Sequence, residues 1–403
     1  MRLHELLVAG LLLFCPALAQ GNDDPEPTSE PDPDPEPPAP TPTGIDAFAN
    51  VTVYQPEDSS HQVTFPRTIN LPNNTVLAAW NEPAEPNGTV HVYRSKDSGF
   101  SWYSLGTAKS RTAGRKLLQP HLLFINGTGR ENDDGEIDYG TVLMAVNAVD
   151  DKSTNIEVYA SWDLGETWEF ASRVVSGGRL TESNGTAVLN PFLLLSGKKI
   201  TVYYTDQRST QRASKLVQQT TTDYYGSWGS AIDAVVSQFA TDRPGTPTVA
   251  KVPSSGHLPN NQYILTYTHS LLDATTNTYT NPVFYKISSS PENFGTAASR
   301  EIRTDTGIIP QGAPFVTWSA LGGPNGTVVL TDSRTASIFI NRARGEGTWA
   351  EVATTAGRAE GREVKVPDDD GTKLRLAGGS EVGQQKPSQI LLTMMDLAKA
   401  IGV

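Results

Sequence analysis

The sequence predicts an all-β fold, a six-bladed β-propeller built from four-stranded antiparallel blades. Three observations predict it: a turn signature that occurs twice, weaker copies of that signature at a regular spacing, and short β-rich runs along most of the chain. The signature reads S-x-D-x-G-x-x-W and begins at Ser95 and again at Ser161. Repeats of about 60 residues are typical of stacked supersecondary units, and residues 45–386 have room for about six of them.

The signature has the chemistry of a tight hairpin turn. The aspartate accepts backbone N–H groups, the glycine adopts φ > 0, the serine adds a local hydrogen bond, and the tryptophan buries apolar area between units. A structural role is therefore expected for Ser95, Asp97, Gly99, Trp102, Ser161, Asp163, Gly165 and Trp168. Weaker copies surround Asp223, Phe294 and Trp349.

Alternating runs separated by Gly, Pro, Asn and Asp predict individual strands. The predicted strands are Thr75–Trp80, Val90–Arg94, Thr141–Val146, Ile156–Ala160, Ile200–Thr205, Tyr263–Thr268, Thr327–Thr331 and Ser337–Asn341. The last stretch, residues 389–403, is predicted to form either a short helix or a closing strand.

The N-terminus predicts export. Residues 1–19 combine a positive end at Arg2, a short apolar stretch and a small-residue cleavage site, as a secretory signal peptide does. Residues 20–44 form an acidic, proline-rich linker that cannot bury a core. The remaining expected divisions are the propeller over 45–386 and a C-terminal tail over 387–403. A secreted, extracellular protein is expected.

The composition of the chain excludes several classes of partner and cofactor. The formal net charge of −12 argues against nucleic acid and against an anionic membrane, and a monomer is expected. The single cysteine, Cys15, lies in the predicted signal peptide, so cysteine catalysis is excluded from the mature chain. The six histidines are scattered without a zinc motif, and no dinucleotide or P-loop motif occurs. No metal or cofactor is expected.

N-x-S/T sequons suit a secreted glycoprotein. They begin at Asn50, Asn73, Asn87, Asn126, Asn184 and Asn325. Those that read Asn-Gly-Thr are equally typical of tight hairpin turns.

The turn signature resembles the Asp-box, or BNR repeat, of the sialidase superfamily of propellers. Longer segments resemble one branch of it, the fungal exo-arabinanases of glycoside hydrolase family 93. These segments are Phe65–Ile69, Tyr203–Arg208, Thr241–Gly245, Val283–Ser289 and Gly345–Trp349. The resemblance implies a six-bladed propeller that cleaves α-1,5-linked arabinan from a chain end and retains the anomeric configuration.

A retaining glycosidase needs two carboxyl groups about 5 Å apart, one as nucleophile and one as acid and base. In the family, one glutamate lies in a Trp-Glu-Pro-Phe segment, which is matched here by Val188–Phe192 with Asn190 at the glutamate position. The other lies in a Thr-Tyr-Glu segment, matched by Thr266–Thr268 with Thr268 at that position. An amide is no general acid and a threonine does not replace a carboxylate. The resemblance therefore leaves open whether this chain is an enzyme.

Other polar residues are alternative candidates for catalysis or for sugar binding. Carboxyl groups expected at strand ends or in the following loops belong to Glu82, Glu182, Asp206, Asp242 and Asp332. The simplest interpretation of the three aspartates is that each forms a structural pair with a nearby arginine, Arg208, Arg243 or Arg334. Sugar-binding candidates are Arg67, Tyr204, Asp206, Arg208, Asp242, Arg243 and Tyr267.

Four hypotheses for the function follow: an arabinan hydrolase with an unorthodox site, a non-catalytic glycan-binding pseudoenzyme, a sialidase that uses Arg67 in an arginine cluster, and a protein-binding propeller.

Overall fold

The computed structural model describes residues 45–125, 140–180, 185–254, 260–368, 370–380 and 388–403. The predicted signal peptide and linker lie outside the described residues, as do Asn126, Glu182 and Asn184.

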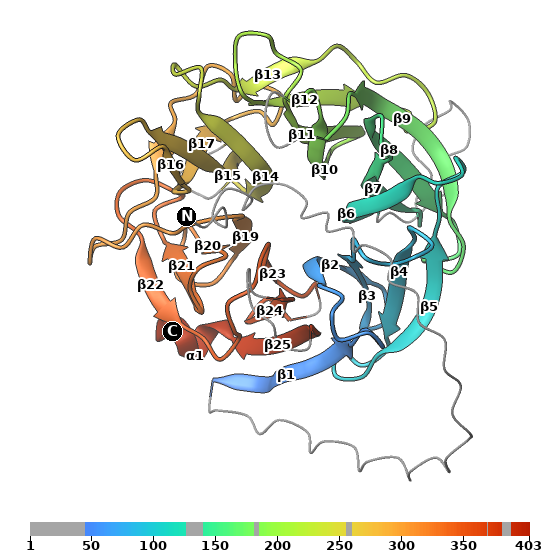
Figure 1. Cartoon of the computed structure of the whole chain (residues 1–403). Helices are drawn as coiled ribbons and strands as arrows, with labels where there is room; N and C mark the ends of the chain where they lie inside the picture. Colours follow the sequence, from blue (N-terminus) through green and yellow to red (C-terminus); the bar gives the residue numbers. More distant parts are fainter. Residues whose placement is uncertain (1–44, 126–139, 181–184, 255–259, 369, 381–387) are drawn as a thin grey trace, which may run out of the picture.

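Six antiparallel sheets stand around a common axis, which confirms the predicted six-bladed propeller (Figure 1). The first three blades each follow the chain in order from the innermost strand to the outermost. They comprise β2 (Thr64–Leu71), β3 (Thr75–Asn81), β4 (Val90–Ser95) and β5 (Tyr103–Ala108); β6 (Lys116–Phe124), β7 (Val142–Val149), β8 (Thr154–Ser161) and β9 (Glu169–Gly177); and β10 (Val188–Ser196), β11 (Lys199–Asp206), β12 (Lys215–Thr221) and β13 (Ile232–Val235).

The fourth and fifth blades follow the same order, with one addition. The fourth consists of β14 (Arg243–Val252), β15 (Gln262–Asp273), β17 (Val283–Ser288) and β18 (Arg300–Glu301), and the short β16 (Thr278–Thr280) pairs with the far end of β15. The fifth consists of β19 (Phe315–Ser319), β20 (Thr327–Thr331), β21 (Ser337–Asn341) and β22 (Ala350–Ala353).

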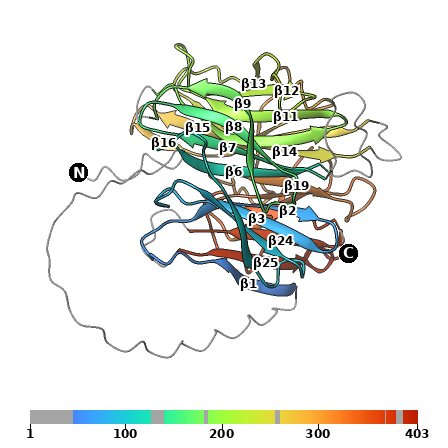
Figure 2. The same ribbon diagram turned by 90° about the vertical axis from the view of Figure 1, so that its right-hand side faces the viewer.

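The sixth blade joins both ends of the chain. Its strands are β23 (Glu363–Lys365), β24 (Lys373–Gly378), β25 (Ile390–Asp396) and β1 (Asp46–Tyr54), and β1 lies beside β25 in both views (Figures 1 and 2). The segment expected as a C-terminal tail thus supplies an interior strand, and the blade extends to Asp396. Only α1 (Leu397–Ile401), capped by Asp396, follows it.

Buried clusters hold adjacent blades together. Leu77 of the first blade and Met144 of the second belong to one cluster, and Leu143 and Val202 join the second blade to the third. Burial of such side chains stabilises the fold by about 25 cal/mol per Å² of apolar surface. Among the described residues, no helix is long and apolar enough to cross a membrane.

The two turn signatures form closely similar turns. In the second, Ser161 Oγ accepts the N–H of Gly165 at 2.7 Å, and Asp163 Oδ1 accepts the N–H of Thr167 at 2.9 Å. Trp168 Nε1 donates to the carbonyl of Gly165 at 3.1 Å. Gly165 has φ 99°, and a Cβ there would meet Leu77 at 2.8 Å. The turn therefore requires glycine both for its backbone and for its contact with the neighbouring blade.

The turn at Ser95 repeats these contacts. Ser95 Oγ accepts the N–H of Gly99 at 2.8 Å, and Trp102 Nε1 donates to the carbonyl of Gly99 at 2.9 Å. Asp97 Oδ1 accepts the N–H of Ser101 at 2.9 Å. Both signatures thus serve as structural turns between strands.

Candidate functional site

Four innermost strands carry the same backbone irregularity near their first residues. Phe65, Gln119, Asn190 and Thr246 are non-glycine residues with φ of 50°, 49°, 55° and 50°, and each precedes a proline. At each of these positions the pairing register with the next strand shifts. A β-bulge of this kind leaves one residue out of the ladder and redirects its side chain. Proline fits there because it has no N–H to pair.

The four bulges surround one small cavity at the end of the central channel where the innermost strands begin, and we call this end the mouth. Arg67, Phe192, Thr248 and the prolines after the bulges complete its wall. Its volume is about 20 Å³, which is room for one or two water molecules and not for a sugar ring. The bottom of the mouth is therefore closed.

Side-chain hydrogen bonds link the bulges from blade to blade. Asn81 Oδ1, at the end of β3, accepts the N–H of Gln119 at 3.0 Å. Gln119 Oε1 in turn accepts the N–H of Asn190 at 3.1 Å, and Asn190 Oδ1 accepts the hydroxyl of Thr205 at 3.3 Å. Because buried N–H groups need partners, these amides hold the strained backbone in place.

Arg67 lies against the same cavity and is 8% exposed. Its Nη1 donates to the carbonyls of Pro66 and Gly361 at 2.7 and 2.8 Å. Its guanidinium lies 4.9 Å from the ring centroid of Phe315, a cation–π distance. Burial lowers the pKa of Arg67 to about 10, and the nearby Glu363 opposes this. The side chain thus remains a cation at neutral pH.

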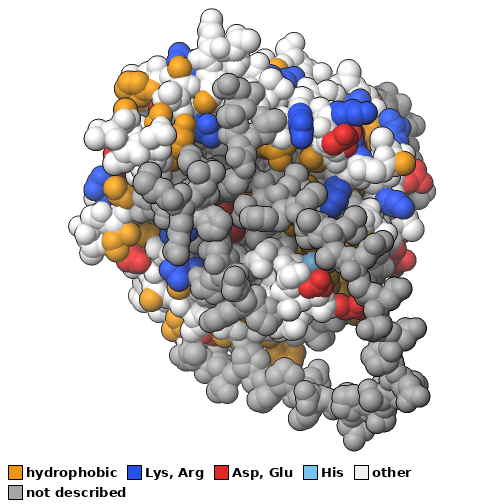
Figure 3. Space-filling view, viewed as in Figure 1, with side chains coloured by type: hydrophobic (Ala, Val, Ile, Leu, Met, Phe, Trp, Pro, Cys, Tyr) orange, Lys and Arg blue, Asp and Glu red, His pale blue; other side chains and the backbone are white. Residues whose placement is uncertain are grey.

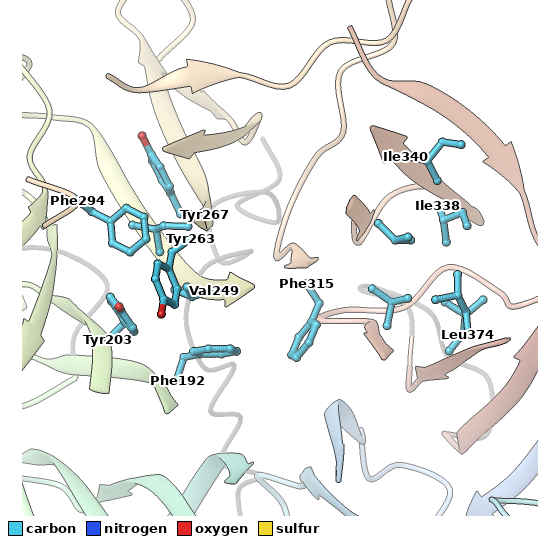
Figure 4. Packing of buried hydrophobic residues seen from close by; sticks show 14 of the residues in the cluster. Phe192, Tyr203, Val249, Tyr263, Tyr267, Phe294, Phe315, Ile338, Ile340 and Leu374 are labelled. Carbon is cyan, nitrogen blue, oxygen red and sulfur yellow. The ribbon is translucent and has the colours of Figure 1, made fainter. Parts of the chain in front are cut away.

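Aromatic rings close the channel beneath the cavity. Phe192 from β10 and Phe315 from β19 project toward each other from the third and fifth blades, with ring centroids 5.9 Å apart (Figure 4). The His121 ring lies 4.1 Å from that of Phe192. We call Phe192, Phe315 and His121 the aromatic plug.

Asn190 and Thr268, the two residues expected from the resemblance to stand at glutamate positions, lie at this mouth. Asn190 is 8% exposed and lines the cavity. Thr268 is 3% exposed; its hydroxyl pairs with that of Thr246 at 2.7 Å and donates to the carbonyl of Gly312 at 2.8 Å. Both side chains are therefore committed to neighbours, and neither carries a group that ionises as a carboxyl does.

The described carboxylates predicted as alternatives have partners. Glu82 Oε1 lies 3.0 Å from His61 Nδ1. Asp332 is fully buried and accepts the N–H groups of Gln311 and Thr335 at 2.9 and 3.0 Å. These contacts tie each carboxylate to a neighbouring loop and resemble structural bracing more than a catalytic pair.

Of the three Asp–Arg pairs that the sequence suggests, including Asp332 with Arg334, the pairs at Asp206 and Asp242 differ in the structure. Asp206 accepts the N–H, Nε and Nη2 of Arg208, and although burial opposes ionisation, these bonds hold the pKa of Asp206 below its usual value. Asp242 instead accepts the hydroxyl of Ser237 and lies 3.3 Å from His269 Nε2. Arg243 is directed to the ring of Tyr279, 4.8 Å from its centroid.

Tyr204 and Tyr267 are core residues in the structure. Both are fully buried, in the clusters between blades. The Tyr204 hydroxyl donates to Gln219 Oε1, and the Tyr267 hydroxyl to Ser299 Oγ, each at 2.9 Å. The prediction that these tyrosines bind sugar does not fit this placement, because neither ring presents a surface to a ligand.

Glu360 is a mouth residue that sequence reasoning missed. Its backbone carbonyl accepts the N–H of Phe65 at 3.1 Å, and the following residue, Gly361, binds Arg67. Both carboxyl oxygens are buried, next to the Ser333 side chain. Burial raises the pKa of Glu360 to about 7, while Arg334 opposes the rise. An isolated glutamate outside any repeated motif gave no signal in the sequence.

The surface around the mouth carries both charges. In Figure 3 basic and acidic side chains are interspersed over the visible face. Asn50, Asn73 and Asn87 of the sequons are exposed, and Asn325 is half-buried. Among the described residues, no group of three or more His, Cys, Asp and Glu side chains could hold a metal ion.

Comparison with known proteins identifies solved structures that resemble this chain. A scan of protein-family models and a search of curated proteins gave no match. Among solved structures, the Penicillium chrysogenum α-L-arabinanase complexed with arabinobiose is 32% identical with a TM-score of 0.79, over 88% of this chain and 99% of that one. The GH93 α-L-arabinofuranosidase of Fusarium graminearum with arabinobiose is 30% identical, with the same TM-score and coverage.

A more distant likeness concerns the fold alone. The NanB sialidase of Streptococcus pneumoniae is 9% identical with a TM-score of 0.56, over 86% of this chain and 70% of that one.

Proposed function

This chain belongs to the GH93 family of arabinofuranosidases and arabinanases, and we propose that it binds arabinan-type glycans without hydrolysing them. One observation carries the proposal: an amide and a hydroxyl, each held by neighbouring groups, occupy the positions matched to the family's two glutamates. A retaining mechanism needs a nucleophile and a proton donor. Neither Asn190 nor Thr268 is suited to either task.

The closed mouth supports the same conclusion. A chain-end sugar has to reach the reacting groups for an exo-acting hydrolase to work, yet the cavity beside Asn190 holds only one or two waters. A glycan would therefore lie across the rim, where Arg208 and Arg243 are partly exposed. Solved relatives were obtained with arabinobiose, and a neutral arabino-oligosaccharide is the proposed ligand. Secretion, predicted from residues 1–19, would bring the protein to plant-wall glycans.

The test is product release from linear α-1,5-arabinan alongside calorimetric binding of arabino-oligosaccharides. The natural protein is expected to bind and to release no product. The double variant Asn190→Glu, Thr268→Glu restores two carboxyl groups but not the space for a sugar, so it is expected to release no product either, as is Asn190→Gln, Thr268→Gln, of matched size and without charge. Turnover by the natural protein would contradict the proposal, as would the absence of any arabinan-type binding.

A hydrolase with a different proton donor is the second candidate, and Glu360 favours it. A carboxyl with a pKa of about 7 is protonated under mildly acidic conditions, as a general acid must be. If the natural protein turns over arabinan, this candidate expects Glu360→Gln to lower kcat at least about 100-fold. An unchanged kcat in that variant would exclude Glu360.

A further inference from the structure

A second and larger cavity lies beyond the aromatic plug. The mouth cavity is lined by the bulge residues that begin the inner strands, whereas this one is lined by later residues of the same strands. Its volume is about 350 Å³, within the range of small-molecule sites. We call it the channel chamber and define it by Leu123, Leu194, Lys251, Thr317, Lys365 and Asp368.

The chamber wall combines apolar and polar surface in similar amounts, with few charges. Leu123, Leu194, Val316 and the half-buried Trp318 provide carbon surface from three blades. Small-molecule sites combine apolar surface with a small number of placed polar groups. Here those groups include two lysines, Lys251 and Lys365, beside Asn70, His121, Thr317 and Asp368.

Lysines provide the positive charge. Lys251 is exposed at the rim of the chamber, and Lys365 lies deeper, with its side chain 24% exposed. The nearest carboxylate to Lys365 Nζ is that of Glu363 at 3.9 Å, too far for a hydrogen bond. Glu363 instead accepts the N–H of Thr68 at 2.8 Å and the Thr68 hydroxyl. The ammonium of Lys365 is therefore paired with Glu363 at ion-pair distance but donates no hydrogen bond to it.

Other cations reinforce the positive potential around Lys365. Arg67, which lies over the Phe315 ring, and the buried Arg375 lie close enough that, after burial itself, they help to lower the pKa of Lys365, whereas Glu363 and Asp368 oppose this. Burial, Lys365 and Arg67 together hold the pKa of His121 well below its usual value. Asp368, exposed at the rim, is the acidic residue of the chamber wall. An anionic ligand would relieve this imbalance.

His121 adds a hydrogen-bond donor at the chamber's deep end. Its Nδ1 accepts the N–H of Leu193 at 3.1 Å, so the neutral ring carries its proton on Nε2. That nitrogen is buried with no partner among the described residues, and the ring lines the chamber. A buried donor without an acceptor is costly.

We propose that the channel chamber binds a small organic acid of sugar size, a uronate or an aldonate, with its carboxylate between Lys251 and Lys365 and its carbon skeleton against the apolar side chains of the wall. The site is separated from the mouth by the aromatic plug, so it is independent of the glycan site proposed above. Because the wall contributes apolar contact, a sugar acid should bind more tightly than a bare anion.

Calorimetric titration of the full chain tests this with four probes: D-galacturonate, D-galactose, acetate and inorganic phosphate. Galacturonate is expected to bind and neutral galactose is not. Lys365→Met should weaken galacturonate binding about tenfold and Lys251→Met about threefold, reflecting a half-buried and an exposed charge. Lys152→Met, an exposed lysine of the second blade, is the matched control and should change nothing.

Histidine NMR gives a second readout. On saturation with galacturonate, the pKa of His121 should rise, because a bound carboxylate stabilises the imidazolium. The proposal is overturned if galacturonate does not bind at tens of millimolar, or if Lys251→Met and Lys365→Met leave its affinity unchanged. Acetate or phosphate binding as tightly as galacturonate would overturn the sugar-acid assignment.

Discussion

Gln119 and Asn190 occupy the same bulge position in successive blades, and the side-chain Oε1 of the first accepts the backbone N–H of the second at 3.1 Å. Asn81 supports Gln119 in the same way at 3.0 Å. The conformation of Asn190 thus depends on an amide from another blade. The mouth is assembled by contacts between blades and not by any one of them.

Removing the Gln119 amide should destabilise the fold. In Gln119→Leu the buried N–H of Asn190 loses its acceptor, which should lower the free energy of unfolding by about 1–3 kcal/mol. Urea denaturation followed by tryptophan fluorescence measures the change. Gln211→Leu, at an exposed position of the third blade, is the control and should stay within about 0.5 kcal/mol of the natural protein. Equal losses in the two variants would contradict the role given to Gln119.

Glu360 should make stability fall as pH rises. Its folded-state pKa is raised from 4.5 to about 7, mainly by burial. Between these values the folded state keeps the proton that the unfolded state has lost, so the stabilisation is complete below pH 4.5 and is lost as pH rises through 7. The difference amounts to about 3 kcal/mol.

Glu360→Gln removes this titration. Urea denaturation of both proteins at intervals from pH 4.5 to 8 should give a stability difference that grows in favour of the variant as pH rises. A difference independent of pH would mean that the carboxyl titrates normally.

Gly361 should not tolerate a side chain. Its φ is 64°, and a Cβ there would meet the Phe65 ring at 2.3 Å. Gly361→Ala should therefore cost about 1–3 kcal/mol through strain and displacement of Phe65. Calorimetric Tm values compare it with Gly371→Ala, where a Cβ meets nothing within 4 Å. The prediction is wrong if both variants melt together.

The Ser161 hydroxyl should stabilise the second turn. Ser161→Ala removes the acceptor of the buried Gly165 N–H and the 2.7 Å bond to Asp163, which should cost about 1–2 kcal/mol. The exposed Ser176 provides the matched Ser→Ala control. Thermal unfolding of the two variants gives the comparison, and a Ser161→Ala protein as stable as the control would contradict the prediction.

The sequence predicted the middle strands of the blades better than the innermost ones. The runs 141–146 and 200–205 alternate or are continuously apolar, and they match β7 and β11. The innermost strands β6 and β10 contain Pro120 and Pro191, and proline demotes a run to non-strand in sequence reasoning. In the structure these prolines lie in β-bulges, and no local sequence pattern predicts a bulge at these positions.

The candidate site residues likewise include some that the structure places at the mouth and some that it places in the core. Arg67 and Asn190 were found because they belong to segments that resemble a known family, and both line the mouth cavity. Tyr204 and Tyr267 came from equally suggestive segments, but they lie on second strands whose alternate side chains face between blades. Which face a strand residue occupies depends on the packing of two sheets, and this is not encoded within a single strand.

The pairing of β1 with β25 has a consequence for biosynthesis. Asp46 lies opposite Met395, so the outer strand of the sixth blade is synthesised before the other strands of the propeller, and its partner β25 is synthesised after them. Until β25 has been synthesised, β1 presents an unpaired strand edge, which is a hazard for aggregation. Closing so long a loop is also entropically slow. Ring closure should therefore be a late step of folding, and chains shortened before residue 396 should fail to complete the sixth blade.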